Sequence, residues 1–250
     1  MGRLIEVCAN SVESAVKAQE GGAYRVELCA GIPEGGTTPS YGEIAVARKL
    51  LTHARLHVII RPRGGDFLYS PLEEEIMAHD IDMATRLGAD GVVIGCLKAD
   101  GSIDTDMAGR LLEHVGKGMS VTFHRAFDMC RDPMEALEQI AGLGIDRILT
   151  SGQEATAEQG IPLLRQLVER AAGRIVIMPG CGVNAGNIEK IARETGAGEF
   201  HLSARSSIGS GMVYRNRRVS MGGTVCIDEY SRPVTTAERV RKTIGALVQQ

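Results

Sequence analysis

The chain has no tryptophan and only four phenylalanines among its 250 residues, so aromatic side chains cannot form most of its core. Its hydrophobic fraction of 44% is nevertheless ordinary for a globular protein. We therefore expect a core of Val, Ile, Leu and Ala, the residues that fill the interior of (β/α)8 barrels.

Long apolar runs and clusters of basic residues are also missing. No run reaches the length of a membrane span, and Glu6 interrupts the N-terminal segment where a signal peptide needs continuous apolar residues. The net charge is −3, and Lys and Arg do not alternate with aromatic residues as they do in single-strand binders. We expect a cytoplasmic protein that binds neither nucleic acid nor a membrane.

Several catalytic and structural motifs are absent as well. The six cysteines are far apart and form no Cys-x-x-Cys pair, which argues against structural zinc and favours free thiols over a disulfide framework. A Gly-x-Gly-x-x-Gly after the first strand and a Gly-x-Ser-x-Gly are missing too. These absences argue against a dinucleotide-binding sheet and against a serine hydrolase.

Short apolar strands alternate with amphipathic helices along the chain. Strands are expected to begin at Leu4, Tyr24, His57, Gly91, Val121, Arg147, Ile175 and Glu199. Helices are expected over 12–19, 41–51, 73–87, 104–114, 134–142, 157–172, 187–195 and 236–248. This pattern predicts a single α/β domain over residues 1–250, a (β/α)8 TIM barrel with a long loop after strand 8; a doubly wound sheet is the alternative.

Two neighbouring strands carry the same inward Glu-x-Cys pattern. Alternation places Glu6 and Cys8 on one face of the first strand, and Glu27 and Cys29 on the same face of the second. Because adjacent strands lie about 4.8 Å apart, both thiolates can reach one soft ion, and Cu(I) is the ion that thiolates select best. Alternatively, each cysteine is only a small buried hydrophobe.

Charged side chains are expected where a barrel interior normally holds aliphatic ones. They form either an acid/base and anion-binding group at the barrel mouth or an internal ion-pair network. Asp128 is expected to cap a loop or to pair with Arg125. The candidate catalytic residues are Glu6, Glu27, Arg61, His124 and His201.

Two loop regions are candidates for binding an anion. Arg61 and Arg63 precede a Gly-Gly-Asp turn and suit a carboxylate or phosphate, unless one pairs with Glu27 and the other is solvated. The loops after strands seven and eight hold the second set, where barrel enzymes often bind phosphate, although glycine-rich turns also serve as plain connections. The residues of this set are Gly180, Gly182, Ser203 and Arg205.

The segment from Arg205 to Val234 is too long for an ordinary connection. It contains too many apolar residues, such as Met212, Val213 and Tyr214, to be disordered. We expect it to fold over the barrel mouth or onto a neighbouring subunit.

Seven short motifs resemble those of the CutC family of proposed copper homeostasis proteins, and the resemblance extends over the whole chain. It implies a cytoplasmic (β/α)8 barrel that is usually oligomeric, as a dimer or tetramer, and that binds Cu(I) through cysteines; Cys8 and Cys29 match the proposed ligands. An enzyme acting on a small carboxylate or phosphate metabolite remains the alternative. The motifs lie at 6–8, 25–29, 34–40, 60–66, 121–129, 149–153 and 214–216.

Overall fold

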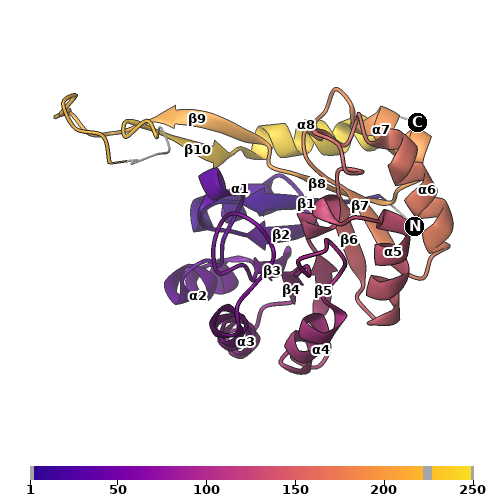
Figure 1. Ribbon diagram of the computed structural model, residues 1–250. Helices are drawn as coiled ribbons and strands as arrows, with labels where there is room; N and C mark the ends of the chain where they lie inside the picture. Colours follow the sequence, from indigo (N-terminus) through magenta and orange to yellow (C-terminus); the bar gives the residue numbers. More distant parts are fainter. Residues whose placement is uncertain (1–2, 222–226, 249–250) are drawn as a thin grey trace.

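The computed structural model describes residues 3–221 and 227–248, and it confirms the predicted barrel. Eight parallel strands run in the order β7-β6-β5-β4-β3-β2-β1-β8, and β7 contacts β8 where the ring closes (Figure 1). The strands are β1 (Leu4–Ala9), β2 (Arg25–Leu28), β3 (Arg55–Ile59), β4 (Gly91–Ile94), β5 (Ser120–Phe123), β6 (Arg147–Thr150), β7 (Val176–Pro179) and β8 (Glu199–Leu202).

The helices begin where the sequence provides capping side chains. Ser40 and Ser70 each form a capping box with a glutamate three residues later, and Asp132 accepts hydrogen bonds from two backbone N–H groups. The helices are α1 (Val12–Glu20), α2 (Tyr41–Leu50), α3 (Pro71–Arg86), α4 (Thr105–Glu113), α5 (Pro133–Gly142), α6 (Ile161–Ala171), α7 (Ile188–Thr195) and α8 (Ala237–Val248), with 3₁₀ turns η1 (Ile32–Glu34) and η2 (Arg125–Met129).

One expected helix boundary is wrong. Helix α6 begins at Ile161, four residues after the expected start at Ala157, because the preceding residues form turns. Gly160 lies so close to Ser151 that an added Cβ atom would be 1.8 Å from the Ser151 carbonyl oxygen. The loop after β6 therefore packs against itself before the helix can start.

The core has the expected aliphatic composition. Alternate strand residues such as Val7, Val26 and Val58 are fully buried and belong to the main hydrophobic core, which the apolar faces of the surrounding helices complete. Three of the four phenylalanines, at 123, 127 and 200, are among the largest fully buried side chains. The outer layer of the barrel is thus apolar, and the polar strand residues point to its interior.

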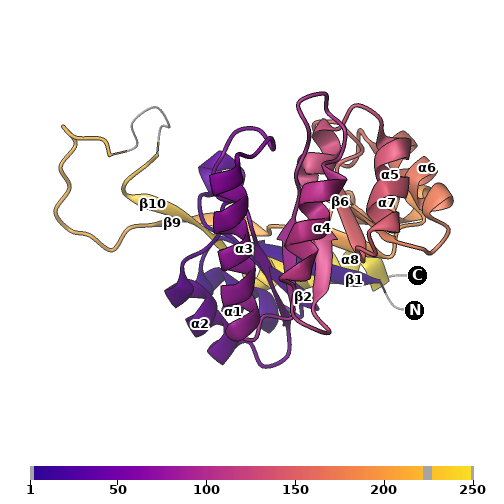
Figure 2. The same cartoon turned by 60° about the horizontal axis from the view of Figure 1, so that its bottom comes forward.

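The segment after β8 is not the irregular loop that we expected. It forms a two-stranded antiparallel ribbon, β9 (Arg205–Gly209) and β10 (Ser231–Thr235), which extends away from the barrel in two views (Figures 1 and 2). We call residues 205–235 the arm. The prediction that this segment covers the mouth is wrong, because the two ends of the arm pair with each other and direct it outward.

No helix among the described residues is long and apolar enough to cross a membrane.

Candidate functional site

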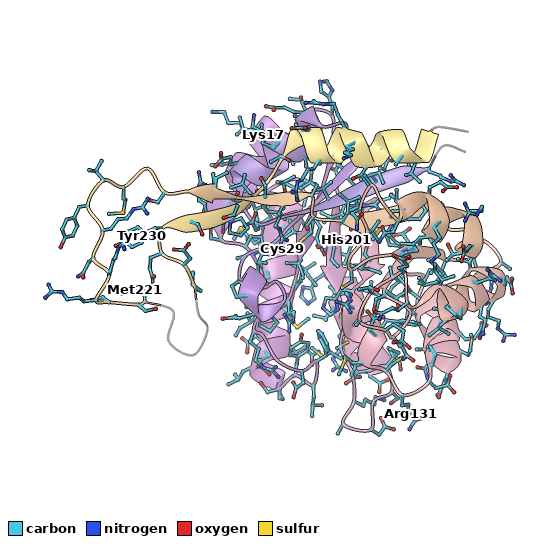
Figure 3. All side chains as sticks on the ribbon, turned by 90° about the horizontal axis from the view of Figure 1, so that it is seen from above. Lys17, Cys29, Arg131, His201, Met221 and Tyr230 are labelled. Atoms are coloured by element: carbon cyan, nitrogen blue, oxygen red, sulfur yellow. The ribbon has the colours of Figure 1, made fainter. Side chains whose placement is uncertain are left out.

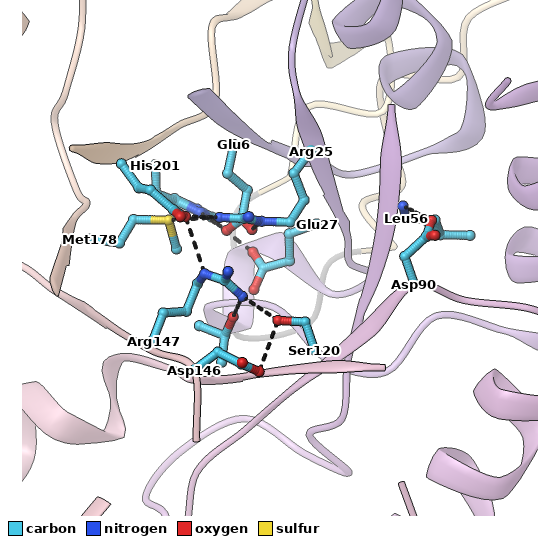
Figure 4. Close-up of polar contacts among 12 residues, drawn as sticks. Glu6, Arg25, Glu27, Leu56, Asp90, Ser120, Asp146, Arg147, Met178 and His201 are labelled. Carbon is cyan, nitrogen blue, oxygen red and sulfur yellow. Dashed lines mark hydrogen bonds and ion pairs between the residues drawn. The ribbon is translucent and has the colours of Figure 1, made fainter. Parts of the chain in front are cut away.

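The lower part of the barrel interior contains a closed network of buried charges (Figure 4). Arg25 forms ion pairs with both Glu6 and Glu199, and the Arg147 Nε atom lies 3.1 Å from Glu199 Oε2. Arg147 also donates to the Ser120 hydroxyl at 2.7 Å. Each of these four charged side chains has an oppositely charged partner, so the network satisfies its charges internally.

His201 connects this network to the barrel mouth. Its Nδ1 atom lies 2.7 Å from Glu6 Oε1, and its Nε2 atom lies 3.6 Å from Glu27 Oε2. Although burial opposes the charged imidazolium, contacts with Cys8, Glu6 and Glu27 raise the pKa of His201 well above its usual value. A protonated His201 can therefore lie between the two carboxylates.

The two glutamates have opposite pKa shifts. Burial raises the pKa of Glu27 to about 8, with the Cys8 and Glu6 charges adding to the effect. Burial also opposes ionisation of Glu6, but Arg25 and His201 outweigh it and hold the pKa of Glu6 well below its usual value. Glu6 is thus the permanent anion, whereas Glu27 can exchange a proton near neutral pH.

Cys8 and Cys29 come together at the upper end of β1 and β2, as the alternation predicted. Their sulfur atoms are 3.5 Å apart, and the Cys29 sulfur lies 3.4 Å from Glu27 Oε2. The three ligand atoms all lie within 4.8 Å of one another. This group of two thiols and one carboxylate is the only set of three His, Cys, Asp or Glu residues suited to hold a metal ion within 3–221 and 227–248.

The two thiols differ in acidity. Hydrogen bonding from Cys29, together with the nearby His201 and Arg205, lowers the pKa of Cys8 well below its usual value. The same contact with Cys8, together with burial, raises the pKa of Cys29 well above it. Arg205 Nη2 is 3.1 Å from the Cys8 sulfur and compensates its charge. Cys8 is therefore the thiol of the pair that ionises more readily.

His124 lies at the end of β5, across the barrel from β1. Its Nδ1 atom accepts a hydrogen bond from the Ala126 backbone N–H at 3.1 Å, so the neutral ring carries its proton on Nε2. Burial and the charge of Arg61 lower the pKa of His124 to about 3. Nε2 is buried and has no hydrogen-bond partner among the described residues. His124 thus presents a neutral, unused donor.

Arg61 does not pair with Glu27, the arrangement that the sequence left open. Its guanidinium instead donates to the carbonyl oxygens of Glu34, Gly36 and Gly65, each at 2.8 Å, and lies over the Phe67 ring. Its buried Nε atom has no partner in the described part of the chain. The loops around Arg61 hold the cation in place without neutralising its charge.

These groups surround a cavity of about 290 Å³, which we call the thiol cavity. The view from above shows Cys29 and His201 near the centre of the barrel (Figure 3). Of the five candidate catalytic residues, Glu6 alone does not line the cavity, because it lies one level below and supports His201. Its polar lining residues are Cys8, Glu27, Cys29, Arg61, His124, Arg125, Asp128 and His201.

A larger cavity of about 790 Å³ adjoins the first and shares Cys8, Gly35, Arg125 and His201 with it. We call it the loop cavity, because the β7–α7 loop and the end of β8 form much of its wall. Among the residues predicted to bind an anion, Gly182, Ser203 and Arg205 line it.

Two predicted anion-binding residues lie elsewhere. Arg63 lines neither cavity and is held by Asp66 and Glu73. Gly180 makes room for its neighbours, since an added Cβ atom would be 2.4 Å from a Leu149 methyl carbon.

Asp128 pairs with Arg125 at 2.7 Å and accepts a hydrogen bond from the Ser151 backbone N–H, which confirms its expected role.

Two cationic residues of the loop cavity were not predicted. Arg239 and Lys242 project into it from α8, the helix that follows the arm. Their spacing of three residues places them on one face of the helix, and this spacing is the feature of the sequence that could have indicated them. Sequence alone does not show that this face meets the barrel mouth.

Comparison with known proteins supports the resemblance. The sequence model of the CutC family matches residues 3–206. The chain is 68% identical to a family protein CutC of Bacteroides fragilis over 98% of this chain and 97% of that protein. It is 50% identical to the human copper homeostasis protein cutC homolog over 99% of this chain and 90% of that protein. A CutC crystal structure from Streptococcus agalactiae superposes with a TM-score of 0.77 at 38% identity, covering 80% of this chain and 98% of that one.

Proposed function

The chain belongs to the CutC family, and we propose that it binds Cu(I) through the thiolates of Cys8 and Cys29. The observation that carries this proposal is the 3.5 Å separation of the two sulfur atoms. Thiolates bind metal ions at about 2.3 Å, and two of them on one ion at a tetrahedral angle are roughly 3.8 Å apart. Two soft donors at nearly this spacing fit Cu(I).

The protonation state of the pair fits metal binding as well. Cys8, with its lowered pKa, provides one thiolate before any ion arrives. Cys29 must lose its proton when it becomes a ligand, and Glu27, with a pKa of about 8, lies 3.4 Å away and can accept or relay it. We therefore expect Cu(I) binding to release protons.

The test is a Cu(I) competition titration of the reduced protein against a chromophoric chelator. Cys8→Ser and Cys29→Ser should each lower the affinity by roughly 100-fold, since one thiolate alone is a poor site. Zn²⁺ should bind much more weakly than Cu(I). Proton release is measured by calorimetry in buffers of different ionisation enthalpy.

Cys181→Ser is the matched control. This thiol lies at the rim and donates to the Ala155 carbonyl oxygen at 3.2 Å, outside the Cys8, Glu27 and Cys29 group. The Cys181→Ser substitution should leave Cu(I) affinity unchanged. If Cys8→Ser and Cys29→Ser bind Cu(I) as tightly as this control, the thiol pair is only part of the core.

We place this function in the cytoplasm, as part of copper homeostasis. The name of the human relative supports the role in copper homeostasis. The cytoplasmic location is supported by the free state of the five cysteines in the described residues, since a reducing compartment keeps thiols available for a soft ion. Cys226 lies outside the described residues.

We infer that the arm joins copies of this chain into a homo-oligomer, a dimer or a tetramer. Its side chains Val213, Tyr214 and Met221 are 99%, 74% and 82% exposed, and Figure 3 shows Met221 and Tyr230 far from the barrel. Apolar side chains gathered on one projecting element are typical of a contact surface. A second copy is the occupant that the resemblance to a usually oligomeric family implies.

Light scattering after size exclusion tests this inference. Val213→Ser combined with Met221→Ser should reduce the mass to that of the monomer. Leu72→Ser removes an equally exposed apolar side chain, 73% exposed, from the start of α3 and should leave the mass unchanged. A monomeric native chain, or an oligomer that survives the arm substitutions, would refute this role of the arm.

A second candidate function is catalysis on a small anionic metabolite. The observation that favours it is the pair of unused buried donors, His124 Nε2 and Arg61 Nε, lining the same cavity as Glu27. A cation and a neutral imidazole N–H can hold the carboxylate or carbonyl oxygen of a ligand. Glu27, with a pKa of about 8, is suited to transfer a proton, and Glu6 remains ionised beneath His201.

A further inference from the structure

Apart from the two thiols of Cys8 and Cys181, every ionisable side chain that lines the loop cavity is basic. Four permanent cations line it, and all of its lining residues belong to the described part of the chain. No aspartate or glutamate is among those residues. A cavity of about 790 Å³ with this lining attracts anions. The clustered cations repel one another, and a bound anion between them relieves this repulsion. The cations are Arg125, Arg205, Arg239 and Lys242.

Three of these cations lack a carboxylate partner, although Arg205 also contacts the Cys8 sulfur. Arg125 pairs with Asp128, but Arg205, Arg239 and Lys242 form no ion pair with any carboxylate within 3–221 and 227–248. The buried Nε atom of Arg205 has no hydrogen-bond partner in that part of the chain. Arg239 donates to the Arg205 carbonyl oxygen, which links α8 to the start of the arm.

The backbone of the cavity wall is unusual as well. Four non-glycine residues of the described chain have positive φ, and two of them, Cys181 (75°) and Ala204 (46°), line this cavity. A left-handed conformation costs a non-glycine residue about 1–2 kcal/mol. Such residues cluster at ligand sites, where successive backbone N–H groups form anion-binding concavities. Gly182, next to Cys181, has φ of 75° as well.

We propose that the loop cavity binds the phosphate group of a small phosphorylated metabolite. A phosphate dianion matches several cations better than a carboxylate with a single charge. The site lies between the loops after β7 and β8, the region where barrels commonly hold phosphate. The rest of the ligand extends through the shared wall of Cys8 and His201 into the thiol cavity. This proposal does not depend on copper, and it names the substrate class of the second candidate function.

The test uses inorganic phosphate as the probe and the reduced, metal-free full chain as the protein. Phosphate binding is measured by ³¹P NMR or calorimetry, with acetate as the probe of single charge. We expect Arg239→Gln and Lys242→Gln each to weaken phosphate binding roughly three- to tenfold, and acetate to bind about tenfold more weakly than phosphate.

Arg241→Gln is the matched control on the same helix. Arg241 does not line the cavity, and its guanidinium donates to the Glu20 carbonyl oxygen at 3.0 Å. The Arg241→Gln substitution removes the same charge and should change phosphate affinity less than twofold. Equal losses in all three variants would show only general surface attraction and overturn the proposal, as would acetate binding as tightly as phosphate or phosphate failing to bind at millimolar concentration.

Cys29→Ser separates this proposal from the copper proposal, because Cys29 lines the thiol cavity and not the loop cavity. This variant should lose Cu(I) affinity but retain phosphate affinity within about threefold, because phosphate is held by the loops and α8. Loss of phosphate binding in Cys29→Ser, with Arg239→Gln unaffected, would place the anion in the thiol cavity and refute the assignment to the loop cavity.

Discussion

The lower layer of the barrel and its mouth both contain buried charge, but they treat it differently. In the lower layer, Arg25 and Arg147 each have a carboxylate partner. At the mouth, Arg61 is held only by carbonyl oxygens, and Arg205 interacts with the Cys8 sulfur. Buried polar groups normally have partners, so missing partners are informative.

This difference separates two roles that the sequence left combined. Each charge of the lower network is paired within that network, which therefore stabilises the closed ring. The mouth leaves donors and cations available, which is what a binding site requires before its ligand arrives. His57 is the exception in the lower part: its buried Nδ1 atom has no partner among the described residues, and burial lowers its pKa to about 3. It therefore stays neutral and disturbs the network little.

The largest expected effect comes from breaking the lower network. Arg25→Met should reduce the free energy of unfolding by about 3–5 kcal/mol at neutral pH, because it leaves the buried Glu6 and the partly buried Glu199 without their shared cation. Urea denaturation monitored by circular dichroism measures this loss. The effect should diminish at low pH, where the carboxylates become protonated.

Arg205→Gln is the corresponding change at the mouth. Cys8 can take up a proton when Arg205 is lost, so the free energy of unfolding should fall by only about 1 kcal/mol. This variant should instead raise the pKa of Cys8, which is followed by thiolate absorbance. If the two arginine variants lose equal stability, the distinction between a structural layer and a binding layer does not hold.

A smaller, pH-dependent effect is expected from Glu27. Its folded pKa of about 8 lies above the unfolded value near 4.5, so the folded state binds the extra proton between these pH values. The stabilisation by this group is complete below pH 4.5 and is lost as the pH rises toward 8. Relative to Glu27→Gln, the native protein should therefore become steadily less stable across this range.

Urea denaturation of both proteins at several pH values between 4.5 and 9 measures this difference. Glu43→Gln is the control, since this residue belongs to a capping box on α2 and lines neither cavity. A difference between native protein and Glu27→Gln that does not vary with pH would show that Glu27 is ionised throughout.

Much of the fold could be predicted from local patterns. The alternation in β1 and β2 predicted that Cys8 and Cys29 share the inward face. The register that pairs Cys8 with Glu27 then brings the sulfur atoms of Cys8 and Cys29 together. The eight strand and helix units predicted the barrel, because parallel strands with crossover helices close at this number. The arm was missed, because its strands pair only with each other and carry no clear alternation.

The sequence by itself determined the barrel, its aliphatic core and the inward direction of Glu6, Glu27 and the two thiols, because these follow from residue periodicity. Only the tertiary structure decided which charges are paired. Arg25 meets Glu199, and Arg205 meets Cys8, across 174 and 197 residues of chain. Side chains so far apart in sequence are brought together by ring closure and strand register, and no local pattern encodes which of the inward charges will find a partner.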